Sequence, residues 1–334
     1  MGMRAMVLDA QASIDTDPLH LKEVDRPDLG PGDVLAQVEV CGICRTDLHV
    51  VEGDLPPVKL PVIPGHQVVG RVVDRGPAAG RFQPGDRIGI AWLRFTDGSC
   101  KYCLRGRENL CLHARFTGYM ADGGYAEFAA VAEDFAYAIP DSIEPVHAAP
   151  LLCAGIIGYR ALKRSDLQPG QRLGIYGFGA SAHVTMQVAL HWGCEVYVAT
   201  RGDRHQALAR DMGAAWVGGS TDTLPVKLDS AILFAPVGEL VPPALEALDR
   251  GGTLALAGIY MSDVPRLNYE RHLFNERNVR SVTANTRQDG AELLQLAATI
   301  PIHTYTETFP LEQANQALQR LKHDQITGAG VLVL

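Results

Sequence analysis

The stretch from Cys41 to His49, Cys-Gly-Ile-Cys-Arg-Thr-Asp-Leu-His, gathers side chains that bind metals or transfer protons. A second stretch, Pro64-Gly-His-Gln67, adds an imidazole. Zinc prefers sulfur and nitrogen ligands in a tetrahedron, and a catalytic zinc takes three ligands from protein and leaves the fourth position to water or substrate. Cys44 and His66 are therefore candidates for two of the three ligands of a catalytic zinc.

The wider pattern resembles the zinc-dependent medium-chain alcohol dehydrogenases over nearly the whole chain. It consists of C-G-I-C-x-T-D-L-H, then P-G-H, then Leu152-Cys-Ala-Gly155. The resemblance implies that Cys44, His66 and Cys153 bind the catalytic zinc, and that Cys41 is a thiol outside the coordination sphere. The alternative is a set of ordinary buried cysteines and a hydrogen-bonded histidine, which explains any one residue alone but not their joint spacing.

The resemblance also assigns roles to the neighbours of Cys44. A zinc ion lowers the pKa of a bound alcohol toward neutrality. The resemblance implies that Thr46 accepts the hydrogen bond from that alcohol and passes the proton, through the cofactor ribose, to His49, a residue type suited to the exit of such a relay. Asp47 is the expected partner of the His66 ring, because metal-bound imidazoles usually donate their other N–H to an oxygen. For Thr46 and Asp47 the alternative is a simple turn pair.

Gln67 departs from the family pattern, in which Glu usually follows the ligand histidine. That carboxylate can approach zinc during ligand exchange. Glutamine has the size of glutamate without its negative charge. We therefore expect the zinc to polarise its bound oxygen more strongly, and we expect slower exchange of zinc ligands where that exchange needs a carboxylate.

A second candidate metal site lies between Asp97 and Cys111. Cys100, Cys103 and Cys111 have the spacing of the family's structural zinc lobe, in which four ligands close the tetrahedron. Asp97 stands at the first ligand position in place of cysteine. Carboxylate oxygen binds zinc, although three thiolates and a carboxylate make a harder site than four thiolates. We expect two zinc ions per chain; the alternative is a degenerate lobe without metal.

Composition and charge limit the classes of function. The chain has 334 residues, enough for two domains that each bury a core. Its net charge is −8, with 30 basic and 38 acidic residues, which predicts no nucleic-acid partner and no attraction to an anionic membrane. No signal peptide or spanning apolar run is recognisable. Seven cysteines, partly in C-x-x-C clusters, favour metal over disulfides in a protein expected to be cytoplasmic.

The hydrophobic periodicity changes along the chain. Short β-branched runs between Gly and Pro turns predict an all-β unit for residues 1–150. Strands alternating with helices predict a doubly wound parallel sheet for residues 151–288. In the family these are a GroES-like catalytic domain and a Rossmann domain, and residues 289–334 return to the first. The strand candidates are 34–40, 67–73, 172–176, 195–199, 230–234, 252–256 and 331–334, and the helix candidates are 181–191, 205–212, 240–248 and 311–321.

A dinucleotide fingerprint follows the strand candidate 172–176 and opens a helix. Gly177 permits the tight turn, Gly179 lets the backbone approach the pyrophosphate, and Ala182 keeps helix and strand close. The helix N-terminus then binds the anion. The alternative is a tight turn between strand and helix, without a ligand.

The residues after the next strand bear on the choice of cofactor. An NAD-preferring enzyme usually has an acidic residue there, which binds the ribose hydroxyls and repels a 2′-phosphate. Thr200 occupies that position and Arg201 follows, so the sequence predicts NADP over NAD. The alternative is that Asp203 takes the acidic role while Arg201 and Arg204 are solvated, which restores NAD.

Together these patterns predict an enzyme, a zinc-dependent alcohol dehydrogenase or aldehyde reductase. It transfers hydride reversibly between a primary or secondary alcohol and NAD(P). Trp92 and Leu55 are candidates for the substrate pocket, and a homodimer or homotetramer is expected from the resemblance alone. The alternatives are a zinc-free quinone or enone reductase of the same superfamily and a non-catalytic nucleotide-binding protein.

Overall fold

The computed structural model describes residues 2–334, which form two compact units. Residues up to 153 together with 284–334 form the first unit, and residues 154–283 form the second. The sequence places these boundaries at 150 and 288. The boundary expected at 150 lies three residues before the observed one. Residues 284–288, expected in the second domain, belong to the first unit because they carry the N-terminal cap of its helix α8 (Arg287–Thr299).

A seven-stranded sheet forms the centre of the first unit. Along the sheet lie β16 (Thr306–Pro310), β17 (Ala329–Val333), β3 (Asp33–Ile43), β4 (Gln67–Arg75), β5 (Arg87–Ile90) and β9 (Ala136–Ala138), and β8 (Phe128–Ala132) pairs with β3. All pairs are antiparallel except β16 with β17. Because β17 pairs with β3, the C-terminal segment completes the sheet of the N-terminal segment, as the sequence predicts.

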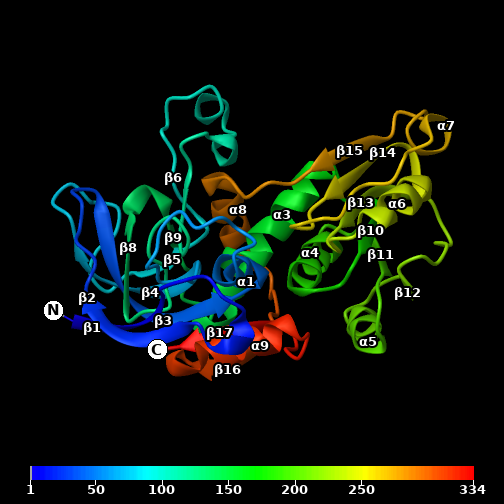
Figure 1. Ribbon diagram of the computed structural model, residues 1–334. Coiled ribbons are helices and arrows are strands. Elements are labelled where there is room, and N and C mark those ends of the chain that lie inside the picture. The colour runs from blue at the N-terminus through cyan, green and yellow to red at the C-terminus, as the bar shows by residue number, and fades with distance from the viewer. Residues whose placement is uncertain (1) are drawn as a thin grey trace. The chain divides into compact units, whose positions relative to one another are not determined.

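Two small sheets and four helices complete the first unit. β1 pairs with β2, and β6 pairs with β7 at the base of a projecting loop (Figure 1). The bounds of these elements are β1 (Gly2–Leu8), β2 (Leu19–Asp25), β6 (Leu93–Phe95), β7 (Arg115–Phe116), α1 (Arg45–Glu52), α2 (Pro145–Ala148), α8 (Arg287–Thr299) and α9 (Ala314–Lys322). The expectation of an all-β unit is therefore wrong in detail. Helix α1 forms because Leu48, Val50 and Val51 bury one of its faces in the core.

The second unit is built on six parallel strands with five helices. In sheet order they are β12 (Trp216–Gly218), β11 (Glu195–Ala199), β10 (Arg172–Tyr176), β13 (Leu228–Leu233), β14 (Leu248–Leu256) and β15 (Asn278–Ser281). The helices are α3 (Ala154–Arg164), α4 (Ala180–His191), α5 (Asp203–Asp211), α6 (Val241–Ala247) and α7 (Tyr269–His272). The order reverses between β10 and β13, which is the arrangement of a dinucleotide-binding sheet (Figure 1). The predicted doubly wound sheet is confirmed.

The central strands β10 and β11 are mostly apolar and buried because helices cover both faces of such a sheet, whereas the edge strand β15 is largely exposed. Four of the five residues of β10 are buried, and the same holds for β11.

Among residues 2–334, no helix combines the length and the apolar character needed to cross a membrane.

An ion pair connects the projecting loop of the first unit to α8. The Glu108 carboxylate accepts hydrogen bonds from the backbone N–H of Arg287 at 2.7 Å and from its guanidinium at 2.7 to 3.1 Å. Burial by itself raises the pKa of Glu108, but the hydrogen bonds and charge of Arg287 outweigh it, so the net pKa lies below its usual value. The pair therefore contributes its full stabilisation at pH values above the pKa of an unfolded glutamate. This stabilisation is lost as the pH falls through the lower pKa that Glu108 has in the folded protein.

We expect Glu108→Gln to lower the free energy of unfolding at neutral pH by about 2 kcal/mol, the scale of hydrogen bonds to a charged group. Urea unfolding at pH 7 and at pH 3 measures the effect, which should shrink at the lower pH. As the control, Asp9→Asn breaks the solvent-exposed pair with Lys22, for which we expect less than about 1 kcal/mol. Equal effects of the two variants would contradict the role given to Glu108.

Candidate metal centres and cofactor site

Cys44 lies at the junction of β3 and α1, where its backbone is extended and its side chain caps the helix. Its sulfur accepts the backbone N–H of Thr46 at 3.3 Å, and its own backbone N–H donates to Asp47 Oδ2 at 2.9 Å. This reciprocal capping fixes the sulfur at a helix N-terminus, which favours the thiolate form.

Three side chains from different parts of the first unit converge on one point. Cys44 Sγ lies 3.4 Å from His66 Nε2 and 3.9 Å from Cys153 Sγ, and His66 Nε2 lies 3.4 Å from Cys153 Sγ. Tetrahedral zinc would place two thiolate sulfurs about 3.8 Å apart and a sulfur and an imidazole nitrogen about 3.6 Å apart. The three atoms therefore fit three corners of a zinc tetrahedron. A hydrogen bond from Cys153 lowers the pKa of Cys44 well below its usual value, with a further contribution from His66, despite burial.

The orientation of His66 is set by Asp47. Its Nδ1 lies 3.0 Å from Asp47 Oδ1, and both side chains are buried. Because an ionised carboxylate only accepts hydrogen bonds, Nδ1 donates to Asp47, and Nε2 faces the two sulfurs, where its lone pair would bind a metal once the ring is neutral.

The backbone before His66 requires glycine. Gly65 has φ +96°, and a Cβ there would lie 2.3 Å from the ring of Tyr125 and 2.8 Å from Cys41 Sγ. Tyr125, which the sequence analysis did not single out, is fully buried, and burial raises the pKa of its hydroxyl well above its usual value. Its ring fixes the turn that carries the ligand. The glycines at 123 and 124 before it are a turn signal that could have pointed to this packing.

Cys41 lies outside the group of three ligands, as the resemblance implies. Its thiol faces the carbonyl oxygen of Gly42 at 3.6 Å and is fully buried. Burial raises the pKa of Cys41 well above its usual value, so the group remains a neutral thiol.

The remaining expected residues of this site lie around the ligands. Thr46 is half-buried in the first turn of α1, and His49 Nδ1 lies 2.7 Å from Asp54 Oδ2. Gln67 is buried and packs against Gly42, and its amide nitrogen has no hydrogen-bond partner among residues 2–334. Asp54 was missed by the sequence analysis, because nothing in its neighbourhood distinguishes it from an ordinary turn residue.

An aromatic stack borders the His66 ring. The Trp92 centroid lies 5.1 Å from that of His66, edge to face, and Trp92 stacks on Phe116 at 4.9 Å and on Tyr119 at 6.0 Å. The stack gives the metal-ligand group an apolar neighbour. Leu55, the other expected pocket residue, is half-buried against the core of the first unit.

The second expected ligand group also comes together. One ligand atom from each of Asp97, Cys100, Cys103 and Cys111 lies within 4.8 Å of all the others, and the sulfurs of Cys100 and Cys103 are 3.6 Å apart. Four converging ligands without an open corner are typical of a structural zinc site. The carboxylate and the three sulfurs therefore fit a zinc ion that has no catalytic position.

The fingerprint in the second unit has the geometry of a dinucleotide turn. Gly177 has φ +87°, and a Cβ there would lie 2.9 Å from the backbone nitrogen of Ala235. Gly179 is the N-cap of α4, where a Cβ would meet nothing within 4 Å, and Ala182 is fully buried against the sheet. The N-terminus of α4 is thus open to an anion at the end of β10.

The residues expected to select the cofactor follow β11. Thr200 is buried, and its backbone N–H donates to the carbonyl of Gly218 at 3.0 Å. Arg201 is exposed directly after it, and Asp203 opens helix α5, with Arg204 exposed as its second residue. Both Arg201 and Asp203 lie near the end of β11, so the geometry leaves both cofactor hypotheses open.

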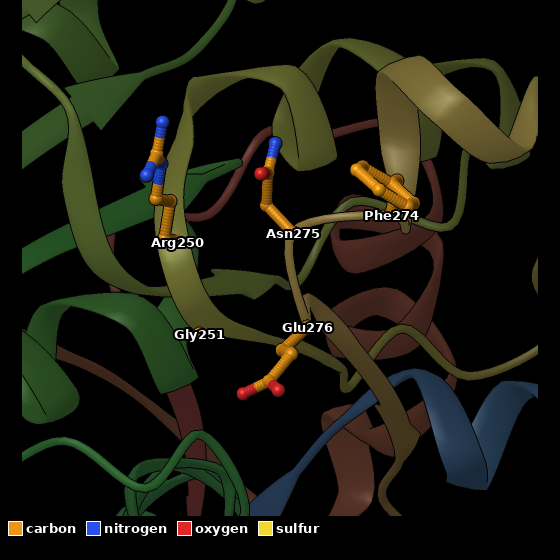
Figure 2. Close-up of a pocket in the computed structure, with 5 residues that line it drawn as sticks. All are labelled: Arg250, Gly251, Phe274, Asn275 and Glu276. Carbon is orange, nitrogen blue, oxygen red and sulfur yellow. The ribbon is translucent and has the colours of Figure 1, made fainter.

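A separate hollow of about 400 Å³ lies in the second unit, near the start of β15. Figure 2 shows its lining, with the side chains of Arg250 and Asn275 on one side and Glu276 extending the other way. The residues that line it are Arg250, Gly251, Phe274, Asn275 and Glu276. No fingerprint residue and no member of either ligand group lines this hollow.

Comparison with known proteins agrees with this geometry. Residues 30–141 match the alcohol dehydrogenase GroES-like domain, and residues 182–299 match the zinc-binding dehydrogenase model. The chain is 54% identical to the probable alcohol dehydrogenase AdhA of Mycobacterium tuberculosis, over 99% of this chain and 97% of that protein. The chain belongs to the zinc-dependent medium-chain alcohol dehydrogenase family. It is therefore an oxidoreductase of the alcohol dehydrogenase type.

Solved structures of family members superpose on the full chain. A cobalt- and zinc-bound thermostable alcohol dehydrogenase from Pyrobaculum aerophilum matches with a TM-score of 0.90 and 25% identity, over 100% of both chains. A zinc-binding dehydrogenase from Sinorhizobium meliloti bound to NADP matches with a TM-score of 0.89 and 27% identity, also over 100% of both chains.

We expect Cys44→Ala, His66→Ala and Cys153→Ala each to remove one zinc per chain, because two protein ligands make an incomplete site. Elemental analysis after gel filtration measures the zinc content. The controls Cys41→Ala and Cys194→Ala remove buried thiols outside both ligand groups and should keep the full content. Loss of zinc from Cys41→Ala with retention by Cys44→Ala would reverse the assignment.

Proposed function

We propose that the chain is a zinc-dependent alcohol dehydrogenase or aldehyde reductase, which transfers hydride reversibly between a primary or secondary alcohol and a nicotinamide cofactor. The observation that carries the proposal is the convergence of Cys44 Sγ, His66 Nε2 and Cys153 Sγ at tetrahedral spacing. Three ligands leave one corner open, which is the arrangement of a catalytic zinc and not of a structural one. A zinc ion bound there would act as a Lewis acid toward the substrate oxygen.

The surrounding residues have separate tasks in this proposal. Asp47 holds the His66 ring through Nδ1 and keeps Nε2 available. As the alcohol loses its proton, Thr46 accepts a hydrogen bond from it and gives up its own hydroxyl proton in the direction of His49, which releases a proton to solvent. Gln67, which is buried against Gly42, adds no carboxylate charge to the site. The alternative of a zinc-free enone reductase gains no support from a complete ligand set.

The aromatic stack supports an apolar substrate. Trp92 lies beside His66 and stacks on Phe116 and Tyr119. Aromatic side chains near a site bind aliphatic or aromatic parts of a substrate through burial of apolar area. Primary aliphatic and aromatic alcohols are the substrates that we propose first.

The direct test is alcohol-dependent reduction of the nicotinamide cofactor by the purified protein. We expect the unmutated protein to turn over aliphatic and aromatic alcohols and the Cys44→Ala variant to be inactive. Chelation of zinc should abolish the activity of the unmutated protein, and added zinc should restore it. Activity that survives removal of all zinc would favour the zinc-free reductase. Zinc without turnover across alcohols and aldehydes would favour the nucleotide-binding protein.

We further propose a second, structural zinc at Asp97, Cys100, Cys103 and Cys111, which makes two per chain. A closed site contributes free energy of folding and no reaction step.

For the cofactor we propose NADP(H) over NAD(H). The residue directly after β11 is Thr200, which carries no charge to repel a 2′-phosphate, and the exposed guanidinium of Arg201 follows it. Guanidinium groups bind phosphate with two parallel hydrogen bonds. The NADP bound to the Sinorhizobium meliloti relative is consistent with this choice.

We expect kcat/KM to be higher with NADP than with NAD. Arg201→Ala should lower the ratio of these two kcat/KM values by about tenfold, because a charged hydrogen bond of about 1.5 kcal/mol is lost. Steady-state kinetics with both cofactors measures it. Arg210→Ala, at the far end of α5, is the matched control. A tenfold preference of the unmutated enzyme for NAD would instead assign the acidic role to Asp203.

A further inference from the structure

The Asp97 carboxylate is bound by several hydrogen-bond donors before any metal is considered. Its Oδ1 accepts the backbone N–H groups of Ser99 at 3.0 Å and Cys100 at 2.9 Å. Its Oδ2 lies 2.7 Å from Nδ1 of His113. Since an ionised carboxylate has no proton to give, the His113 ring donates through Nδ1.

This arrangement determines which oxygen faces a metal. A carboxylate offers about two acceptor positions on each oxygen. Both positions on Oδ1 are taken by backbone N–H groups, and one on Oδ2 is taken by His113. The remaining position lies on Oδ2, so the oxygen that a cation would use is the one that the His113 ring holds.

His113 also contacts a second ligand. Its backbone N–H donates to Cys111 Sγ at 3.4 Å. The His113 side chain is 75% exposed, so it contributes little to the core and its ring contact is with Asp97. A single surface residue thus bonds two of the four candidate ligands, one through its ring and the other through its backbone.

We propose that His113 is the positioning residue that orients Asp97 as the oxygen ligand of the second zinc site. The inference rests on the proposed occupancy of that site and is independent of the alcohol dehydrogenase chemistry. Rotation about the terminal torsion of an aspartate is soft. The backbone N–H groups of Ser99 and Cys100 restrain Oδ1, and the His113 ring is the partner that restrains Oδ2, the oxygen left for the metal. A cysteine at the same position would offer a single donor atom, so it would need no partner to select between two.

The ionisation of Asp97 agrees with this role. The backbone N–H of Cys100 and then the His113 ring hold the pKa of Asp97 far below its usual value. The group is therefore an anion, as a zinc ligand must be.

The test measures zinc release from the purified holoenzyme by competition with a chromophoric chelator. We expect two zinc ions in the unmutated protein. In His113→Ala we expect the affinity of the second site to fall by about 10- to 100-fold, the usual effect of losing such a partner, with the zinc of the Cys44 site retained.

Two further variants separate a hydrogen bond from general loss of structure. In asparagine the amide nitrogen stands as far from Cβ as Nδ1 does in histidine, whereas in glutamine it is one bond further away. The His113→Asn variant should therefore keep most of the zinc affinity of the second site, whereas His113→Gln should lose as much of it as His113→Ala does. A purely structural surface role would not distinguish them.

A double-mutant cycle gives the decisive comparison. In an Asp97→Cys background, which has no carboxylate for the ring to hold, His113→Ala should change zinc affinity by less than about threefold. An equal loss in both backgrounds would overturn the proposal, and so would unchanged zinc release in His113→Ala. One zinc per chain in a fully active enzyme would also overturn it while leaving the proposed alcohol dehydrogenase function intact.

Discussion

One buried carboxylate, that of Asp47, holds two of the three candidate zinc ligands at once. Its Oδ2 accepts the backbone N–H of Cys44, and its Oδ1 faces Nδ1 of His66. The first bond fixes the start of α1, and the second fixes the imidazole that arrives from the turn before β4. Two segments that are distant in the sequence are therefore aligned by a single side chain.

That alignment requires close packing, because a buried anion is stable only when its hydrogen bonds are satisfied. Burial raises the pKa of Asp47, and the nearby His66 ring counteracts it. Gly65 is confined by the Tyr125 ring, so the turn that delivers His66 has little freedom. Hydrogen bonds and packing within the first unit therefore support the positions of Cys44 and His66.

The sequence was sufficient for those parts of the site that depend on spacing. Cys44, His66 and Cys153 follow from the motif, and the strands at 172–176 and 195–199 follow from short apolar runs, which a sheet covered on both faces requires. It was not sufficient for partners that depend on three-dimensional folding. Asp54 beside His49 and Tyr125 over Gly65 belong to no motif, and their roles arise only when the chain is packed. Helix α1 was missed because its apolar residues are few and it lies among strands.

The departures from the family pattern at Asp97 and Gln67 differ in their electrostatic effect. Asp97 replaces a thiolate by another anion, so the charge of its ligand group is unchanged and only the hardness and the number of donor atoms differ. Gln67 replaces an anion by a neutral amide beside a buried site that already contains the Asp47 carboxylate. A second buried carboxylate there would repel the first and raise the pKa of both groups. The amide avoids that repulsion, at the cost of a buried nitrogen with no hydrogen-bond partner among residues 2–334. Under the proposed function, the chain thus keeps the negative charge of the Asp97 ligand group and gives up one at the open site, where a bound zinc ion would draw electron density more strongly from a substrate oxygen.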